Sequence, residues 1–280
     1  MILVTGATGH VGRELVPQLL EMGHSVRVLV RDPHKVAQLD PGVERAVGDL
    51  ERPATLESAM AGVDGIFLLT FQTDQDANVL AAAKRAGVRR VVKLSTLEAS
   101  DLRLQIGRWH RERERLIEGS GLEWTFLRPG MFMSNAVDWW AESIKGQGGV
   151  FFPGGKARVA PIDPRDVAAV AAAALTRPGH EGHVYELTGP ELLTIRQMVE
   201  TIEHVLGSPL RYQNIPPFVA RFFMSRSGMD KSLVKALMEL VASLQRDEGA
   251  VATGTVEQVL GRAPRSFEAW CLEHVDSFRS

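Results

Sequence analysis

Short apolar runs and segments with helical periodicity alternate over residues 1–94. The runs have the length and uninterrupted hydrophobicity of parallel strands that are buried on both faces, and they cover residues 2–5, 25–30, 42–47, 65–70 and 88–94. After the first run, Val11, Leu15 and Leu19 recur at a spacing of four, and further helices are predicted over 33–39, 55–60 and 76–86. This order predicts an α/β fold with a doubly wound parallel sheet of the Rossmann type.

A glycine-rich loop separates the first strand from the first helix. Its glycines follow the spacing G-x-x-G-x-x-G, which suits a backbone that turns tightly, approaches a diphosphate and packs the helix against the strand. The N–H groups at the start of the helix then bind phosphate, helped by the helix dipole. We therefore predict cofactor binding by the loop, with a purely structural turn as the alternative. The predicted contacts are Gly6, Thr8, Gly9, His10, Val11 and Gly12.

The end of the second strand indicates which dinucleotide is bound. An acidic residue there would accept a hydrogen bond from the ribose 2′-hydroxyl of NAD. The strand ends instead in Arg31, whose guanidinium can bind a 2′-phosphate, and Lys35 follows one turn later as a second cation. NADP(H) is therefore the predicted cofactor. Asp32 keeps NAD(H) as the alternative.

Three more residues complete the predicted cofactor contacts. Asp49 follows the third strand, where its carboxylate can accept a hydrogen bond from an adenine amine, and a turn-capping role is the alternative. Leu50 comes next in the chain, and Thr70 ends the fourth strand. Ligands of open α/β sheets bind at the carboxyl ends of the strands, where these residues are expected.

The glycine loop belongs to a set of segments that covers nearly the whole chain. The others are 28–33, 48–50, 120–130, 162–168 and 260–267. Together they resemble the NmrA-like branch of the short-chain dehydrogenase/reductase superfamily. The resemblance implies one NmrA-like domain over 1–280, with a nucleotide-binding core over 1–130 and a part over 131–280 that completes the core and forms a small, mostly helical substrate lobe. It also implies NADPH-dependent reduction of quinones or other conjugated compounds, or redox sensing without catalysis.

The proton donor that is usual in that superfamily is missing. Catalytic members carry a Tyr and, four residues later, a Lys, whereas Tyr185 and Tyr212 of this chain are followed at that spacing by Gly189 and Pro216. Reduction of an unactivated ketone needs a positioned acid. A quinone or similar acceptor gives a delocalised product with a phenol-like pKa of about 10, which needs far less help. We therefore predict hydride transfer from the nicotinamide to an electron-poor conjugated acceptor.

Two residues are candidates for catalytic roles. Ser95 follows the fifth strand, where its hydroxyl can bind a substrate carbonyl, and an N-cap is the alternative. His110 takes the position of the superfamily's Lys when Glu114 is aligned with its downstream acid. We expect His110 to contact the nicotinamide ribose or to relay a proton, with Glu114 orienting the ring. The mixed charges around it are also typical of a solvated helix face.

An apolar segment after the sixth strand is predicted to line the acceptor pocket. Its thioether and aromatic side chains suit a flat acceptor, although such residues also form ordinary cores. They are Met131, Phe132, Met133, Trp139 and Trp140. Further on, residues 216–229 are predicted to be irregular and 233–244 to form an amphipathic helix; this part could be a lid over the acceptor or a subunit contact.

Composition narrows the function classes. The 280 residues carry 32 Lys and Arg against 34 Asp and Glu, a net charge of −2, so no nucleic-acid partner is expected. No apolar stretch reaches the roughly 20 residues needed to span a bilayer, and the first residues lack the features of a secretory signal. The single Cys271 suits a reducing compartment, and no His cluster indicates a metal. We expect a cytoplasmic monomer or homodimer without a membrane partner.

The features above predict an NADPH-dependent reductase that acts on a conjugated small molecule. The missing acid also fits a non-catalytic regulator that senses NADP(H) and binds a protein partner. A biosynthetic cyclase or isomerase on the same fold is a further alternative.

Overall fold

The computed structural model describes residues 1–36, 38–248 and 250–279, without the side chain of Lys35. The chain forms two compact units, which we describe separately. Unit 1 consists of Met1–Leu97, Trp109–Pro129 and Pro164–Glu186. Unit 2 consists of Glu98–Arg108, Gly130–Asp163 and Leu187–Ser280.

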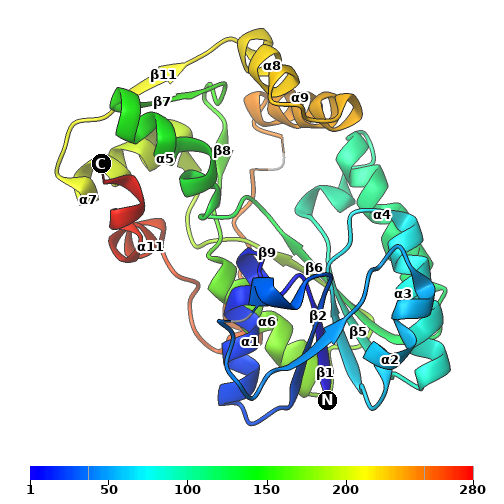
Figure 1. Ribbon diagram of the computed structural model, residues 1–280. Helices are drawn as coiled ribbons and strands as arrows, with labels where there is room; N and C mark the ends of the chain where they lie inside the picture. Colours follow the sequence, from blue (N-terminus) through cyan, green and yellow to red (C-terminus); the bar gives the residue numbers. More distant parts are fainter. Residues whose placement is uncertain (37, 249, 280) are drawn as a thin grey trace. The chain divides into compact units, whose positions relative to one another are not determined.

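A seven-stranded sheet forms the centre of unit 1 (Figure 1). Its strand order is β3-β2-β1-β4-β5-β6-β9, and all pairs from β3 to β6 are parallel. The chain begins in the middle of the sheet and adds strands first on one side of β1 and then on the other. The strands are β1 (Ile2–Thr5), β2 (Val26–Val30), β3 (Glu44–Val47), β4 (Gly65–Leu68), β5 (Arg90–Leu94), β6 (Glu123–Pro129) and β9 (His183–Leu187). The predicted doubly wound parallel sheet is confirmed, and each of the five predicted strands ends within two residues of its predicted bounds.

Helices cover both faces of this sheet. Figure 1 shows α1 and α6 on one face and α2, α3 and α4 on the other. Side chains of α2 and α3 pack with Leu3, Ile66 and Val91 of the sheet in one apolar core. Burial on both faces explains why the strands are uninterrupted apolar runs. The helices are α1 (His10–Glu21), α2 (Glu57–Met60), α3 (Thr73–Ala86), α4 (Gln105–Glu118) and α6 (Pro164–Thr176).

Unit 2 contains two small sheets and most of the remaining helices. β7 (Gly149–Phe152) pairs in parallel with β11 (Arg211–Asn214), and β8 (Arg158–Val159) pairs antiparallel with β10 (Leu193–Thr194). The core contains the buried side chains of Trp140, Met198, Ile202, Phe267 and Trp270. The helices are α5 (Asn135–Gln147), α7 (Ile195–Leu206), α8 (Pro217–Arg226), α9 (Lys231–Gln245), α10 (Thr255–Leu260) and α11 (Phe267–Glu273). Short 3-10 helices cover Pro33–Val36, Pro53–Thr55, Leu97–Ser100 and Val275–Phe278.

Two predicted segments differ from the structure. The predicted helix over 33–39 is only a 3-10 helix at Pro33–Val36, and residue 37 lies outside the described residues. The prediction that 216–229 is irregular was wrong, because α8 lies within it. The paired prolines and clustered aromatic residues obscured its periodicity. Pro217 nevertheless suits the first helical turn, where the missing N–H has no partner to lose.

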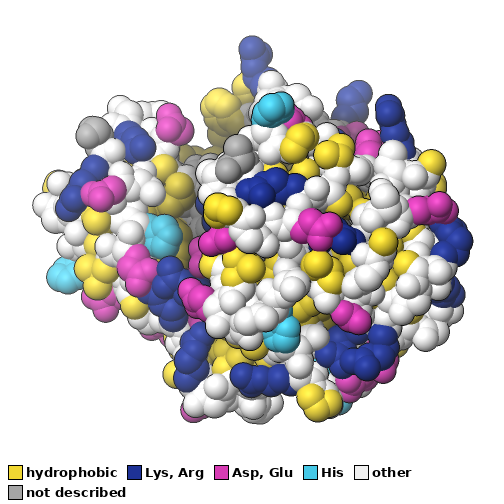
Figure 2. All heavy atoms as spheres, turned by 60° about the horizontal axis from the view of Figure 1, so that its bottom comes forward, with side chains coloured by type: hydrophobic (Ala, Val, Ile, Leu, Met, Phe, Trp, Pro, Cys, Tyr) yellow, Lys and Arg dark blue, Asp and Glu magenta, His cyan; other side chains and the backbone are white. Residues whose placement is uncertain are grey.

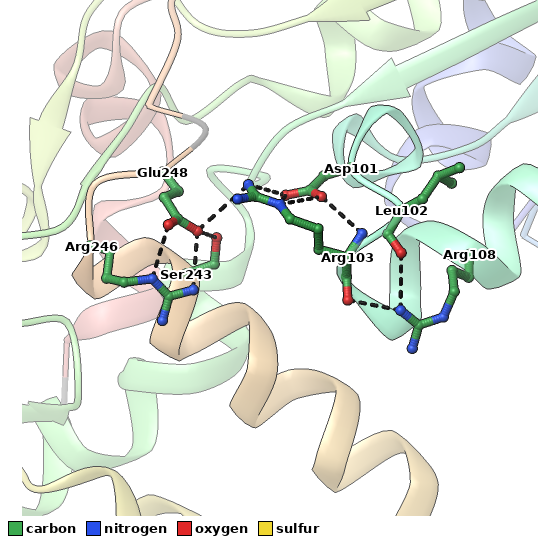
Figure 3. A network of polar contacts seen from close by, with 7 residues as sticks. All are labelled: Asp101, Leu102, Arg103, Arg108, Ser243, Arg246 and Glu248. Carbon is green, nitrogen blue, oxygen red and sulfur yellow. Dashed lines mark hydrogen bonds and ion pairs between the residues drawn. The ribbon is translucent and has the colours of Figure 1, made fainter.

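An exposed polar network links residues 101–108 to the end of α9 within unit 2 (Figure 3). Arg103 lies 2.7 Å from Asp101 and 3.7 Å from Glu248. Glu248 also pairs with Arg246 at 3.0 Å. Because the Arg103 and Arg246 side chains are largely exposed to solvent, each pair contributes little stability.

Charged side chains of both signs are mixed on the face shown in Figure 2, where Lys and Arg lie among Asp and Glu. Within the described ranges, no helix is long and apolar enough to cross a membrane. Nor does any group of His, Cys, Asp and Glu side chains in the described part of the chain form a set that could hold a metal ion.

Candidate cofactor and active site

The glycine loop packs the start of α1 directly onto the end of β1. Gly6 has a φ of +67°, a conformation that favours glycine. A Cβ atom at Gly12 would lie 2.2 Å from the Gly6 carbonyl oxygen, so no side chain fits there. Gly9 caps α1 without a side-chain hydrogen bond, and the first turn contains no acidic residue. The N-terminus of α1 therefore has neither a side-chain cap nor a carboxylate of its own, as a diphosphate site requires.

The other predicted loop residues differ in how they could contact a ligand. Thr8 is exposed and His10 is half-buried, so their side chains face the loop surface. Val11 is buried, which leaves its backbone amide as the group that could meet a phosphate.

Arg31 stands exposed at the end of β2, and its guanidinium bonds to no described residue. Asp32 instead accepts a hydrogen bond from the N–H of His34 at 3.0 Å and so stabilises the start of the 3-10 helix. This arrangement leaves the cation, rather than the neighbouring carboxylate, available for a ribose substituent. The side chain of Lys35 lies outside the described part of the chain.

The loop after β3 is held by turn and helix contacts. Asp49 accepts a hydrogen bond from the Glu51 N–H at 3.0 Å, which is the turn role that its sequence position allowed. The Leu50 carbonyl accepts from the Asn78 amide at 2.9 Å. Both predicted contact residues therefore lie on a loop that α3 fixes in place.

A buried polar cluster that was not predicted from the sequence lies at the carboxyl ends of β4 and β5. Lys93 of β5 and Asp76 of α3 are both fully buried and form an ion pair at 3.2 Å. The Lys93 ammonium also donates to the Thr70 hydroxyl, which donates to Asp76 at 2.8 Å. Burial lowers the pKa of Lys93 to about 8, although the Asp76 carboxylate opposes this shift and Arg113 adds to it. The predicted site residue Thr70 is thus the centre of a buried charge cluster.

Arg113 and His110 of α4 complete this cluster. The Arg113 guanidinium donates to the Thr70 carbonyl at 3.0 Å. The buried Nδ1 atom of His110 has no hydrogen-bond partner among the described residues. Burial, with the charges of Arg113 and Lys93, lowers the pKa of His110 to about 2. The imidazole of His110 is therefore neutral at pH 7, and the residue does not act as an imidazolium acid.

Ser95 faces a second buried network. Its hydroxyl donates to the Glu114 carboxylate at 2.6 Å, and Arg128 binds the same carboxylate through two contacts at 2.9 and 2.6 Å. Arg111 adds a contact to Glu114 at 3.3 Å. Glu114 is thus engaged by Ser95 and two arginines and does not orient His110. The Ser95 proton points to Glu114 rather than to an open site.

The five predicted acceptor contacts, all in unit 2, have different surroundings. Met133 and Trp140 are fully buried in the unit 2 core. Met131 and Phe132 are half-buried, and Trp139 is largely exposed and stacks on Phe152. Contact of these residues with an acceptor stays a prediction, with Trp139 the most accessible of them.

The Lys93–Asp76 pair generates a stability prediction. Lys93→Met leaves the buried Asp76 carboxylate without its cation, and we expect a loss of about 3–5 kcal/mol in the free energy of unfolding. Asp76→Leu leaves the buried Lys93 ammonium without its carboxylate and should lower the free energy of unfolding by a similar amount. The double variant Lys93→Met/Asp76→Leu should recover most of this loss. Urea denaturation measures all three. Losses that simply add in the double variant would contradict a coupled pair.

The lowered pKa of His110 generates a pH prediction. The unfolded chain takes up a proton on this residue below about pH 6.5, and the folded chain does not, so acid favours unfolding. We expect the wild type to lose up to about 1.4 kcal/mol more per pH unit below that point than His110→Gln does. Denaturation at pH 7 and pH 4.5 tests this, with the exposed His34→Gln as control. Parallel curves for wild type and His110→Gln would show that His110 titrates normally.

Comparison with known proteins agrees with this geometry. The model of a family described as NAD(P)H-binding matches residues 6–178. An NAD(P)H azoreductase of Xenophilus azovorans is 39% identical, with 99% of each chain covered. A (4-alkanoyl-5-oxo-2,5-dihydrofuran-3-yl)methyl phosphate reductase of Streptomyces griseus subsp. griseus is 41% identical, again over 99% of each chain.

Among solved structures, an NADPH-dependent quinone oxidoreductase of Escherichia coli in complex with NADPH superimposes with a TM-score of 0.86. It is 27% identical, and the match covers 98% of this chain and 99% of that one. The family match spans more than half of the chain, and it includes the glycine loop, Arg31 and the buried cluster at Thr70. The family relationship predicted from the sequence is confirmed, and this chain belongs to the NAD(P)H-binding family.

Proposed function

We propose that the protein is an NADPH-dependent reductase that transfers a hydride to a quinone or a similar conjugated small molecule. The observation that carries this proposal is the uncapped N-terminus of α1, packed by Gly12 onto the end of β1. Relatives that match over the whole chain are named for the reduction of azo and dihydrofuranone compounds, and a structural neighbour for the reduction of quinones. These substrates share an electron-poor conjugated system.

The residues of unit 1 suit a bound dinucleotide. The amides that start α1 would hold the diphosphate, and Arg31, whose guanidinium bonds to no described residue, would hold the 2′-phosphate of NADPH. When bound, NADPH supplies the hydride. The protein's own part is to orient the cofactor at the carboxyl edge of the sheet and to present the acceptor beside it.

The polar side chains near this edge favour acceptors that need no strong acid. His110 is neutral, and the Ser95 hydroxyl is engaged by Glu114. Neither group is a strong proton donor that could protonate a basic alkoxide. A quinone or azo compound spreads the new charge over a conjugated system, so water can supply the remaining proton.

The proposed partner is therefore a small conjugated acceptor. The one cysteine, Cys271, is buried and unpaired, which supports the expected cytoplasmic setting. A monomer and a homodimer both satisfy the proposal, because every residue that it assigns to the cofactor lies in unit 1 of one chain.

Arg31 generates a test of cofactor choice. Arg31→Ala removes a charge-assisted bond to the 2′-phosphate, and we expect NADPH binding to weaken by about 1.5–3 kcal/mol. NADH lacks this phosphate, so its affinity should barely change. Fluorescence titration of both cofactors measures the effect, with the exposed Arg115→Ala of α4 as control. Equal losses for NADPH and NADH would contradict the assigned role.

The proposed activity is tested by NADPH oxidation with a panel of quinones, azo dyes and conjugated lactones. We expect turnover with at least one of these classes and none with simple aliphatic ketones. A protein that binds NADPH but oxidises it with no member of the panel would contradict the proposal. A cofactor-dependent change in the binding of a protein partner, without turnover, would favour a regulator instead.

A further inference from the structure

Phe71 is an exposed aromatic residue at the carboxyl edge of the central sheet. It follows Thr70 after the end of β4, and the residue is 79% exposed. This is the largest exposed fraction among the large apolar side chains of the described residues. A single exposed apolar residue needs no explanation by itself. The surroundings of its backbone, however, are unusual for a residue that only meets solvent.

Buried polar groups fix the chain on both sides of this ring. Before it, the Arg113 guanidinium binds the Thr70 carbonyl, and Lys93 and Asp76 bind the Thr70 hydroxyl. The N–H of Phe71 itself donates to the buried amide of Gln75 at 2.9 Å. The exposed ring of Phe71 thus belongs to a loop whose backbone is fixed by hydrogen bonds to buried side chains. Binding sites need this combination of accessible contact group and rigid support.

The strand order places Phe71 on the nicotinamide side of the cofactor site. The order β3-β2-β1-β4 puts the crossover point between β1 and β4, and a dinucleotide bound there extends over both halves of the sheet. Arg31 and Asp49 follow β2 and β3, which belong to the adenosine half. Phe71 follows β4, in the other half. The loop remains close to the diphosphate site, because the Leu69 N–H donates to the Thr5 side chain of β1 at 2.7 Å.

We propose that Phe71 is a substrate-binding residue on which the flat ring of the acceptor stacks, with Thr70 and Gln75 as positioning residues that hold this platform. The inference rests on the proposed function and narrows its substrate class. It gives planar aromatic acceptors, such as quinones and aryl azo compounds, an advantage over aliphatic conjugated ones. The adenine ring of the cofactor could also stack on an exposed aromatic side chain. The strand order disfavours this alternative, because Phe71 follows β4 and the adenosine half of the site lies at β2 and β3.

The test measures acceptor binding without turnover. Menadione is titrated by calorimetry into the NADP⁺-loaded protein, in which no hydride is available. We expect Phe71→Ala to weaken menadione binding about tenfold, which is the loss of one aromatic stack. Phe71→Tyr should bind menadione as the wild type does, and Phe71→Leu should recover only part of the affinity. NADP⁺ affinity should stay unchanged in all three variants.

Leu272→Ala is the control, because Leu272 is also an exposed apolar residue but lies on α11, outside the segments predicted to contact the acceptor. It should bind menadione like the wild type. Equal menadione affinity in wild type and Phe71→Ala would overturn the inference, and so would a wild type that binds no menadione. A loss of NADP⁺ affinity with menadione binding intact would assign the ring to the cofactor and overturn it too.

The proposed activity can fail separately. If menadione binds through Phe71 but NADPH is oxidised with no member of the acceptor panel, stacking on Phe71 is supported and the reductase proposal is contradicted. If Phe71→Ala oxidises NADPH with the same KM for menadione as the wild type, the reductase proposal is supported and stacking on Phe71 is contradicted.

Gln75→Met tests the positioning role. It leaves the Phe71 N–H without its acceptor, and we expect menadione binding to weaken about threefold, less than when the ring is removed. In the Phe71→Ala background the same change should have no further effect on menadione. Equal weakening in both backgrounds would mean that Gln75 acts on general structure rather than through the ring.

Discussion

The contact between Gly12 and the carbonyl of Gly6 governs the rest of unit 1. A methyl group at residue 12 would lie 2.2 Å from that oxygen, so glycine alone lets α1 start directly against the end of β1. The uncapped helix terminus is thereby placed in the middle of the sheet, at the point where strand order reverses. Arg31 then lies on one side of this point and Phe71 on the other. The proposed cofactor site and the proposed acceptor site both depend on this close approach of two backbone segments.

Buried charge gives this edge of the sheet its rigidity. A lysine, an arginine and a carboxylate meet around Thr70, although burial of charge opposes folding. Such a cluster contributes less stability than apolar packing would, but it holds a short loop in one conformation. The glutamate network around Ser95 does the same at the end of β5. The chain thus uses polar side chains beside its cofactor site chiefly as supports, which fits a reaction that needs geometry more than acid catalysis.

Local patterns predicted the sheet and the cofactor loop because each depends on neighbouring residues. Uninterrupted apolar runs identify strands buried on both faces, and the glycine spacing identifies the turn. The buried cluster escaped prediction because its members come from the loop after β4 and from α3, β5 and α4, and only the fold brings them together. Lys93 did carry a signal, since it is a cation between Val92 and Leu94 in a strand predicted to be buried. The hydrogen bond from Ser95 to Glu114 and the neutral state of His110 depend on burial in the folded chain, which the spacing of residues in the sequence does not show.

The most direct test of this account is a backbone amide NMR titration with NADP⁺. If the start of α1 binds the diphosphate, the largest changes in the shifts of amide protons and nitrogens should fall on residues 9–12. The loop at 70–71 should respond at the same cofactor concentrations. Saturable binding that leaves the amides of 9–12 unchanged while shifting those elsewhere would contradict the account at its foundation.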